Sequence, residues 1–392
     1  EPALTRIREA LEAKEKVVIY GDYDVDGICS IVLLKQCLDM LGTEVDYYVP
    51  DRFSEGYGLN VPAVEKLAQK GYKLLISVDC GITSVAEVER AQSLGRDVII
   101  SDHHTPGNKL PPAEAIINPK LGSNKQLAEL AGAGVVFKLC QALCPEYVRD
   151  KKSNWLELVA LATVADVVPL TGENRILVKY GLMKLQETNN PGLQALIKES
   201  GLGGKELFSW HIGFVLAPRL NSAGRMESAS SSIELLLTDD PHKAGELAIF
   251  LCSLNNERRE IEETIYQEAL LRVEEQLKLE KESILVLDGE GWHQGVTGIV
   301  ASRLCEKFRC PVIMISWDKD MGKGSCRSPS GLNIYEALSA CSNYLSQFGG
   351  HRAAAGLSIH RDKFADFCHA IRQWVKDNIK EERSEEHTSE LQ

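Results

Sequence analysis

An apolar run followed directly by alternating carboxylates constrains this chain most strongly. Val17–Tyr20 is apolar, and Asp22, Asp24 and Asp26 follow it at every second position, just before Gly27. Alternate side chains of an extended backbone share a face, so the three carboxylates can converge at the end of a strand. Anions so close together repel unless a cation neutralises them, and open α/β sheets hold ligands at strand ends. The segment therefore predicts a divalent-metal site, with an acidic turn of solvated aspartates as the alternative.

The overall composition is that of an ordinary globular protein. The chain has 392 residues, 44% hydrophobic and 26% charged, enough for about two or three domains. No apolar run approaches the roughly 18 residues that span a bilayer. The formal net charge of −12 excludes a surface coated with basic residues but permits a local basic groove. The 11 cysteines show no CxxC spacing, which indicates reduced core residues of a cytoplasmic protein with no membrane association.

Strand-like and helix-like segments alternate from residue 15 to about residue 120. The expected strands cover residues 16–20, 45–50, 74–79, 98–101 and, at the edge, 113–119, and the expected helices cover residues 27–41, 62–70 and 84–94. This alternation predicts βαβ units and a mostly parallel sheet. Helical patterns dominate from residue 131 to about residue 200. From about 240 to 280 the pattern predicts one long connecting helix, or two shorter helices with a turn.

A second α/β pattern begins at Ser283. Its expected strands are residues 284–287, 312–316 and 356–359, and its expected helices are residues 297–308 and 334–342. The predicted architecture is therefore an α/β protein with a parallel-sheet domain over 1–238, a long connecting helix over 239–280 and a smaller α/β domain over 281–378. We expect the substrate in a cleft between the two domains and a disordered tail over 379–392.

Further polar residues follow the other predicted strands. Asp79 ends the strand at 74–79, and Asp102, His103 and His104 follow the strand at 98–101. Asp166 lies within the apolar segment 161–170, where a charge is costly unless it is paired or bound to a metal. Each feature has an ordinary alternative: a turn aspartate, an incidental histidine pair, and a helix cap or salt bridge.

Together these residues make a set rich in carboxylate oxygen with at least one imidazole. Such a set suits Mn²⁺ or Mg²⁺ better than zinc in a thiolate cage. The ligands are numerous enough for two ions that share a bridging carboxylate. Paired ions of this kind recur in enzymes that hydrolyse phosphoesters. The sequence therefore predicts a two-metal phosphoesterase with two divalent cofactors.

These motifs, in this order, resemble the DHH phosphoesterase family, which is named for the triplet at 102–104. Residues 349–356 look like the glycine-rich motif of the DHHA1 domain that accompanies it. The segments 21–28, 51–58, 164–170 and 217–226 make the chain most similar to the members that digest single-stranded DNA from the 5′ end. The resemblance covers about residues 15 to 375. Such members normally carry an OB-fold module, and none is read after about residue 378, so we expect a catalytic core.

The resemblance also implies roles for individual residues. One metal would be held by Asp24 and Asp79 with Asp22 close by, and the other by Asp26, Asp79, His103 and Asp166. His104, with Asp102 beside it, would act on the scissile phosphate as the catalytic pair. The substrate-binding residues would be Arg219, Asn221, Arg225, Ser325, Arg327, Gly350 and His351, with Ser325 and Arg327 at the 5′ end.

From the residues alone, these second-domain assignments stay open. Each arginine is equally a surface ion pair, and each glycine pair is equally a turn. Trp292 is either a base-stacking residue on a substrate-facing loop or a half-buried structural residue.

The expected function is a metal-dependent 5′→3′ exonuclease that hydrolyses single-stranded DNA to 5′-mononucleotides in DNA repair and recombination. The expected partners are single-stranded DNA and, as further candidates, a single-strand-binding protein and a helicase, with the enzyme a monomer. One alternative is a phosphodiesterase of the same family that acts on nano-oligonucleotides, cyclic dinucleotides or phosphorylated nucleotides. Another is a binding or scaffold protein without catalysis, which the complete ligand set disfavours.

Overall fold

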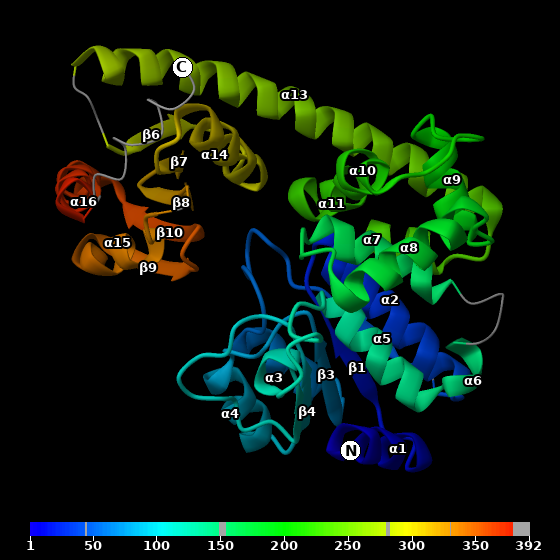
Figure 1. Ribbon diagram of the computed structural model, residues 1–392. Helices are drawn as coiled ribbons and strands as arrows, with labels where there is room; N and C mark the ends of the chain where they lie inside the picture. Colours follow the sequence, from blue (N-terminus) through cyan, green and yellow to red (C-terminus); the bar gives the residue numbers. More distant parts are fainter. Residues whose placement is uncertain (44, 149–153, 280–282, 330, 379–392) are drawn as a thin grey trace, which may run out of the picture. The chain divides into compact units, whose positions relative to one another are not determined.

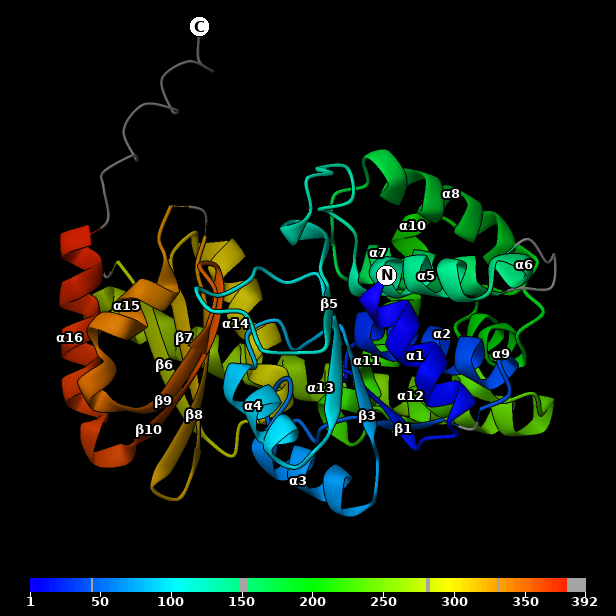
Figure 2. The same cartoon turned by 90° about the horizontal axis from the view of Figure 1, so that it is seen from below.

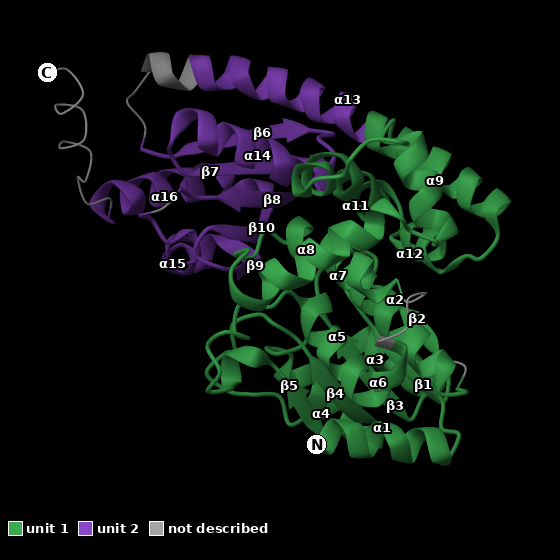
Figure 3. Cartoon of the chain, turned by 45° about the vertical axis from the view of Figure 1, so that its right-hand side comes forward, with its two compact units in different colours: residues 1–256 green, residues 257–392 purple. Residues whose placement is uncertain are grey.

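The computed structural model describes residues 1–43, 45–148, 154–279, 283–329 and 331–378 (Figure 1). The expected tail at 379–392 lies outside the described residues. The chain divides into two compact units, residues 1–256 (unit 1) and 257–392 (unit 2), coloured separately in Figure 3. The division falls within α13 (Pro241–Leu279), a single helix of 39 residues, so the prediction of one long helix is confirmed.

Unit 1 is built around a five-stranded sheet in the order β2-β1-β3-β4-β5. The strands are β1 (Val17–Tyr20), β2 (Asp46–Tyr48), β3 (Leu74–Val78), β4 (Asp97–Ser101) and β5 (Ala115–Ile117). Every neighbouring pair is parallel, which confirms the predicted parallel sheet. Residues 17–20 and 74–78 are buried without exception, as expected of strands covered on both faces.

Helices cover both faces of this sheet (Figure 1). On one face, β1 residues Val17 and Ile19 join a core with α2 (Val25–Met40), α5 (Gly132–Leu143) and α7 (Trp155–Ala165). On the other face, Val18 and Tyr20 join α3 (Val61–Gln69) and α4 (Val85–Ser93). The remaining helices of unit 1 are α1 (Pro2–Glu12), η1 (Pro119–Leu121), α6 (Pro145–Val148), α8 (Gly172–Gln186), α9 (Pro191–Glu199), α10 (Ser209–His211), the π-helical η2 (Ile212–Leu216), α11 (Ala217–Met226) and α12 (Ser230–Leu237).

The strand order determines where a site can form in unit 1. From β1 the chain crosses to β2 on one side, and β3 then returns to the other side of β1. Such a reversal leaves a crevice beyond the carboxyl ends of β1 and β3, the usual ligand position in open α/β sheets. Asp22–Asp26 and Asp79 follow these two strands directly, so the crevice is lined by acids.

One buried carboxyl group of unit 1 lies within the helical layer. Glu157, on α7, is 3% exposed and accepts a hydrogen bond of 2.7 Å from the hydroxyl of Thr188. Burial raises the pKa of Glu157 to about 7, although the Thr188 hydrogen bond opposes the shift.

Unit 2 contains a second, mixed sheet in the order β6-β7-β8-β10-β9 (Figure 2). Its strands are β6 (Leu285–Glu290), β7 (Val312–Asp318), β8 (Met321–Arg327), β9 (Leu345–Gly350) and β10 (Ala354–His360), and its helices are α14 (Gln294–Phe308), α15 (Ile334–Ala340), η3 (Ser342–Tyr344), η4 (Arg361–Lys363) and α16 (Phe364–Asn378). Only β6 and β7 pair in parallel. The smaller α/β domain is confirmed, but β8 and β9 were not expected.

Several open points of the sequence are answered by packing. Trp292 is 4% exposed and its indole N–H donates to Glu268 Oε2 at 2.8 Å, so it is a structural residue and no base-stacking surface. All 11 cysteines are free, and most are buried, as expected for reduced core residues. Within the part of the chain that the structure describes, no helix is both long enough and apolar enough to cross a membrane.

Candidate metal centre

Three strand ends and one helix end bring the predicted acids together. Asp22, Asp24 and Asp26 follow β1, Asp79 follows β3, and His103 follows β4 by two residues. Because β1, β3 and β4 are adjacent and parallel, these side chains meet at one edge of the sheet. The carboxyl ends of parallel strands are thus the reason that distant segments of sequence converge here.

The turn after β1 is shaped by its own aspartates. Asp24 is the N-cap of α2 and accepts hydrogen bonds from the backbone N–H groups of Asp26 and Gly27. A Cβ on Gly27 would lie 2.5 Å from the carbonyl oxygen of Asp22, so only glycine permits this close approach. Asp22 and Asp26 are each 2% exposed.

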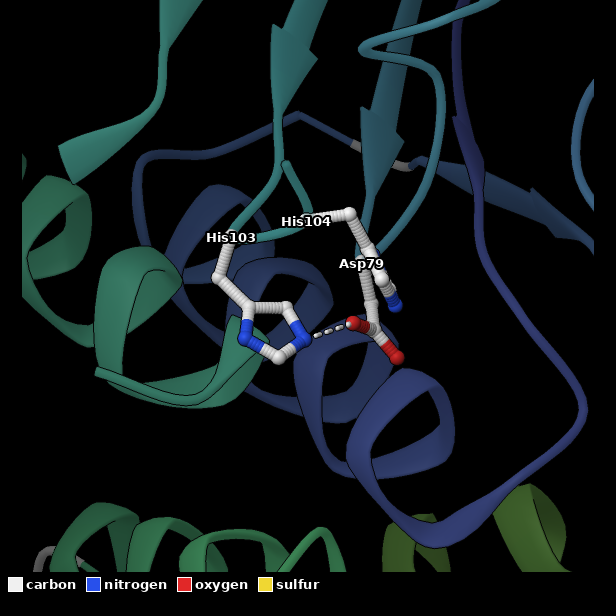
Figure 4. Close-up of side chains that lie close together, drawn as sticks. All are labelled: Asp79, His103 and His104. Atoms are coloured by element: carbon white, nitrogen blue, oxygen red, sulfur yellow. Dashed lines mark ion pairs between the residues drawn. The ribbon is translucent and has the colours of Figure 1, made fainter. Parts of the chain in front are cut away.

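The convergent side chains form three overlapping groups whose ligand atoms lie within 4.8 Å of one another. The groups are Asp22, Asp24 and Asp79; Asp26, His103 and Asp166; and Asp79, His103 and His104. Asp166 joins from the C-cap of α7. Figure 4 shows Asp79 facing the imidazole of His103 at the ends of their strands. Asp79 therefore belongs to two of the groups, and each residue predicted as a metal ligand lies in at least one group.

His103 lies at the centre of the carboxylates. Its Nε2 is 3.2 Å from Asp79 Oδ1 and 3.7 Å from an oxygen of both Asp26 and Asp166. Burial lowers the pKa of His103 to about 4, so the imidazole is neutral at neutral pH. Burial raises the pKa of Asp166 to about 6, and the nearby Asp24 adds to the shift.

Burial also raises the pKa values of Asp22, Asp26 and Asp79 well above the usual range of a carboxyl group. Neighbouring carboxylates add to the shift in each case: Asp24 for Asp22, Asp166 for Asp26, and Asp26 for Asp79. Buried like charges of this kind are unfavourable unless a cation balances them.

The unpaired atoms of the cluster fit a bound cation. Among the described residues, Asp22 Oδ1, Asp79 Oδ1 and His103 Nε2 are buried atoms without a hydrogen-bond partner. Because the imidazole of His103 is neutral and buried beside a carboxylate, both groups can offer lone pairs to the same point. Carboxylate oxygens with one imidazole are a donor set suited to Mn²⁺ or Mg²⁺. The residues present therefore fit divalent cations.

Asp102 and His104 form a separate pair beside the cluster. His104 Nδ1 lies 2.7 Å from Asp102 Oδ1, and Asp102 also accepts from the backbone N–H groups of His103, His104 and Ile82. Burial works to raise the pKa of Asp102, but the hydrogen bonds from His104 and Ile82 lower it overall. For His104, burial works to lower the pKa, but the contact with Asp102 raises it overall. Asp102 thus fixes the orientation of the His104 ring.

Two contributions to the site were missed in the sequence. The backbone N–H groups of Gly132 and Ala133, at the start of α5, donate to the two oxygens of Asp26 at 2.6 and 2.7 Å. The phenol of Tyr57 lies 3.4 Å from His104 Nε2, and its ring meets that imidazole edge-on. Tyr57 belongs to the segment 51–58 that supported the resemblance, but backbone donors carry no signal in side-chain chemistry.

The predicted substrate residues of unit 1 lie on α11, against the turn after β1. The side-chain carbonyl of Asn221 accepts a hydrogen bond of 3.0 Å from the backbone N–H of Val25. Arg219 Nη1 donates to the carbonyl of Val215 at 2.7 Å, and Arg225 is half-buried. The Asn221 contact joins α11 to the acidic turn, and the roles of the three residues toward a substrate stay predictions.

Three of the four predicted residues of unit 2 lie on the antiparallel part of its sheet, and His351 lies in the turn between β9 and β10. Ser325 and Arg327 are on β8, where Arg327 Nε donates to the hydroxyl of Ser302 on α14 at 3.1 Å. Gly350 ends β9 at φ 138°, and a Cβ there would lie 2.5 Å from Ala355 Cα, so the fold itself requires this glycine. His351 follows in the exposed turn to β10, so these glycines belong to a strand end rather than to a free loop.

Comparison with known families identifies the two units. The parallel-sheet unit with its acidic centre and the small mixed-sheet unit together form a DHH–DHHA1 architecture. Residues 16–163 match the DHH family, N-terminal domain, and residues 281–377 match the DHHA1 domain. The chain is 43% identical over 383 residues to the single-stranded-DNA-specific exonuclease RecJ of Bacillus subtilis (strain 168), covering 97% of this chain and 48% of that protein. It is 40% identical over 406 residues to RecJ of Escherichia coli (strain K12), covering 97% of this chain and 70% of that protein.

Solved structures agree with this relationship. A crystal structure of RecJ in complex with Mn²⁺ from Thermus thermophilus matches with a TM-score of 0.85 and 33% identity over 96% of this chain and 54% of that one. A crystal structure of exonuclease RecJ bound to manganese matches with a TM-score of 0.84 and 34% identity over 95% of this chain and 93% of that one. The chain belongs to the RecJ family, and it spans about half the length of the Bacillus subtilis relative (48%).

Proposed function

We propose that this protein is a metal-dependent exonuclease that hydrolyses single-stranded DNA from its 5′ end and releases 5′-mononucleotides. The observation that carries the proposal is the buried acidic centre at the β1–β3 reversal, whose groups overlap at Asp79 and His103. Its relatives are named as single-stranded-DNA-specific exonucleases, and related structures hold Mn²⁺ or Mg²⁺. The same centre is expected to hold two divalent cations in this chain.

The residues of this centre would hold two different cations. Asp22, Asp24 and Asp79 would hold one cation, and these three form one of the groups. Asp26, His103 and Asp166, which form another group, would hold the second cation together with Asp79, whose Oδ1 lies 3.2 Å from His103 Nε2. When bound, such cations act as Lewis acids toward a phosphodiester and lower the pKa of bound water.

The Asp102–His104 pair would act on the phosphate itself. Because Asp102 Oδ1 lies 2.7 Å from Nδ1, the other ring nitrogen of His104, Nε2, would be the one that faces a phosphoryl oxygen, beside the Tyr57 hydroxyl at 3.4 Å. The raised pKa of His104 favours the protonated imidazole, which is the form that stabilises developing negative charge. Its place in a group with Asp79 and His103 leaves metal coordination as the competing role, which metal analysis of variants can distinguish.

The substrate contacts would come from both units. Arg219, Asn221 and Arg225 are proposed to face the strand near the acidic turn, and Ser325 and Arg327 to hold its 5′ end, since arginine binds phosphate through paired N–H donors. Gly350 and His351 are proposed to approach the strand backbone. We further propose a cytoplasmic monomer that works with a single-strand-binding protein and a helicase in DNA repair and recombination; these points are supported by the family relationship alone.

The test is a Mn²⁺-dependent digestion of single-stranded DNA labelled at either end, with a dinucleotide as a second substrate. We expect early release of the 5′ label as a mononucleotide and gradual shortening of the 3′-labelled strand. Early release of the 3′ label would contradict the polarity. Hydrolysis of the dinucleotide without digestion of the long strand would favour the alternative phosphodiesterase.

A further inference from the structure

Val167 combines two unfavourable features directly beside the metal centre. Its φ is +59°, in the left-handed region that a β-branched side chain rarely adopts. Its isopropyl group is 84% exposed. Val167 follows Asp166, whose carboxylate lies 3.7 Å from His103 Nε2. The backbone N–H of Val167 donates to the carbonyl of Val164 at 3.3 Å, but its exposed isopropyl group buries little apolar surface in unit 1.

Val167 can be compared with the other described residues whose φ is positive. Outside glycine, they are Lys14, Asp79, Arg309 and Lys319. The three cationic residues are exposed and lie between regular elements, where a left-handed residue serves an ordinary turn. Asp79 is a ligand of the centre. Val167 is therefore the only apolar member of this described set, and strain of this kind is typical of functional positions.

The exposure of the ligands shows from which side the centre is reached. The Asp26 and Asp79 side chains are 1% and 3% exposed, and that of His103 is 10% exposed. The carboxylate of Asp166 is 27% exposed, more than any of these three. Solvent therefore reaches the centre at Asp166, as it does at His104, whose side chain is 31% exposed, and at the half-buried Asp24. A phosphodiester that enters on the side of Asp166 passes the residue that follows it.

We propose that Val167 is a substrate-contacting residue, whose isopropyl group packs against the nucleoside next to the scissile phosphodiester. The chemistry of a nucleotide supports this contact. Its phosphate is charged and suits the cations, whereas its sugar and base offer apolar surface that suits an isopropyl group. The inference rests on the proposed function, since it assumes a nucleic-acid strand as substrate.

The experiment compares Val167→Gly and Val167→Asn with Val167→Leu. Glycine and asparagine accept positive φ but remove the apolar contact, so both variants should melt at a higher temperature than the wild type. Both should raise KM for single-stranded DNA roughly 10-fold, the effect of losing a small apolar contact, with a smaller change in kcat. Val167→Leu should keep KM within about 3-fold of the wild type, since it retains the apolar contact. Lys14→Gly is the matched control, which should gain stability without any change in KM.

Metal binding separates this contact from a positioning role. Mn²⁺ affinity, measured by electron paramagnetic resonance, should be unchanged in Val167→Gly. A loss of Mn²⁺ affinity would instead show that Val167 acts through Asp166, and an unchanged KM, or a lower melting temperature, would equally overturn the proposal. If the wild type binds Mn²⁺ but does not digest single-stranded DNA, the proposed function itself fails. If the wild type is active and Val167→Gly has the same KM, only the role of Val167 fails.

Discussion

Gly132→Ala is the substitution that tests the architecture of the metal centre most directly. Gly132 begins α5, and its backbone N–H donates to Asp26 at 2.6 Å. A Cβ at this position would lie 2.6 Å from Asp79 Oδ1 and 2.9 Å from the Cβ and Cγ atoms of Asp79. One methyl group would therefore disturb the ligand that two of the three groups share.

The size of the effect follows from these distances. Relief of the overlap requires Asp79 Oδ1 to move from 2.6 Å to about 3.5 Å, a displacement of roughly 0.9 Å. Functional side chains must be held within about 0.5 Å of their productive positions. We expect Mn²⁺ affinity to fall about 10- to 100-fold, the usual result of disturbing the groups that orient metal ligands. Overpacking lowers the free energy of unfolding by about 1–3 kcal/mol, and the higher helix propensity of alanine relative to glycine offsets up to about 1 kcal/mol of this loss.

Gly134→Ala provides the matched control on the same helix. A Cβ there would lie 3.3 Å from the side chain of Leu130, which is the far end of a flexible group, and it approaches no ligand. Both variants should be titrated with Mn²⁺ by isothermal calorimetry and melted with and without Mn²⁺. We expect weakened binding and a smaller Mn²⁺-induced rise in melting temperature for Gly132→Ala alone. Wild-type Mn²⁺ affinity in a folded Gly132→Ala protein would refute the reasoning.

Four further variants and one stability measurement extend the test. Asp79→Ala should abolish turnover and lower Mn²⁺ content at both positions in metal analysis; two tightly bound ions would exclude a shared ligand. His103→Ala should lose metal, whereas His104→Ala should keep it and lower kcat about 10²- to 10³-fold; equal metal loss would remove the distinction. Arg327→Ala should slow digestion of 5′-phosphorylated strands more than of 5′-hydroxyl strands, and an unchanged preference would contradict a 5′-phosphate contact. Because the pKa of Glu157 is raised from 4.5 to about 7, its contribution to stability is complete below about pH 4.5 and is lost as the pH rises through 7. Between pH 5 and pH 8, the free energy of unfolding in urea should therefore fall by about 3 kcal/mol less for Glu157→Gln than for the wild type. Parallel pH profiles of the two proteins would be inconsistent with a raised pKa of Glu157.

Most of unit 1 could be predicted because its sequence signals are local and agree with its topology. The strands at β1, β3 and β4 are short apolar runs, each followed by polar residues, and parallel strands bring their carboxyl ends to one edge. Asp166 was predictable from a different signal, a charge within an otherwise apolar segment. The predicted metal ligands are side chains whose chemistry is visible in the sequence, so their convergence follows once the sheet is parallel.

Unit 2 was less predictable because its strands lack the usual signal. β8 reads Met-Gly-Lys-Gly-Ser-Cys-Arg and β9 ends in two glycines, a composition typical of turns rather than strands. Gly322 and Gly324 are needed because a Cβ would lie 2.6 and 2.8 Å from the side chains of Trp317 and Leu357. These glycines therefore reflect cross-strand packing, which appears only in the folded sheet. By contrast α16, with Phe367, Ile371 and Val375 buried at helical spacing, does carry its signal in the sequence, although no helix was expected there.

The backbone amides of α5 balance the charge of only part of the acidic centre, so the other carboxylates need a metal ion for this. Asp26 is balanced by two N–H donors of 2.6 and 2.7 Å, which account for one lone pair on each of its oxygens. The buried Oδ1 atoms of Asp22 and Asp79 have no such partner among the described residues. A fold that hydrogen-bonded all of these oxygens would be more stable alone, but it would leave no donor atoms for a cation. The backbone holds Asp24 and Asp26, whereas one oxygen each of Asp22 and Asp79 is left unsatisfied, so that part of the free energy of metal binding would become stability of unit 1.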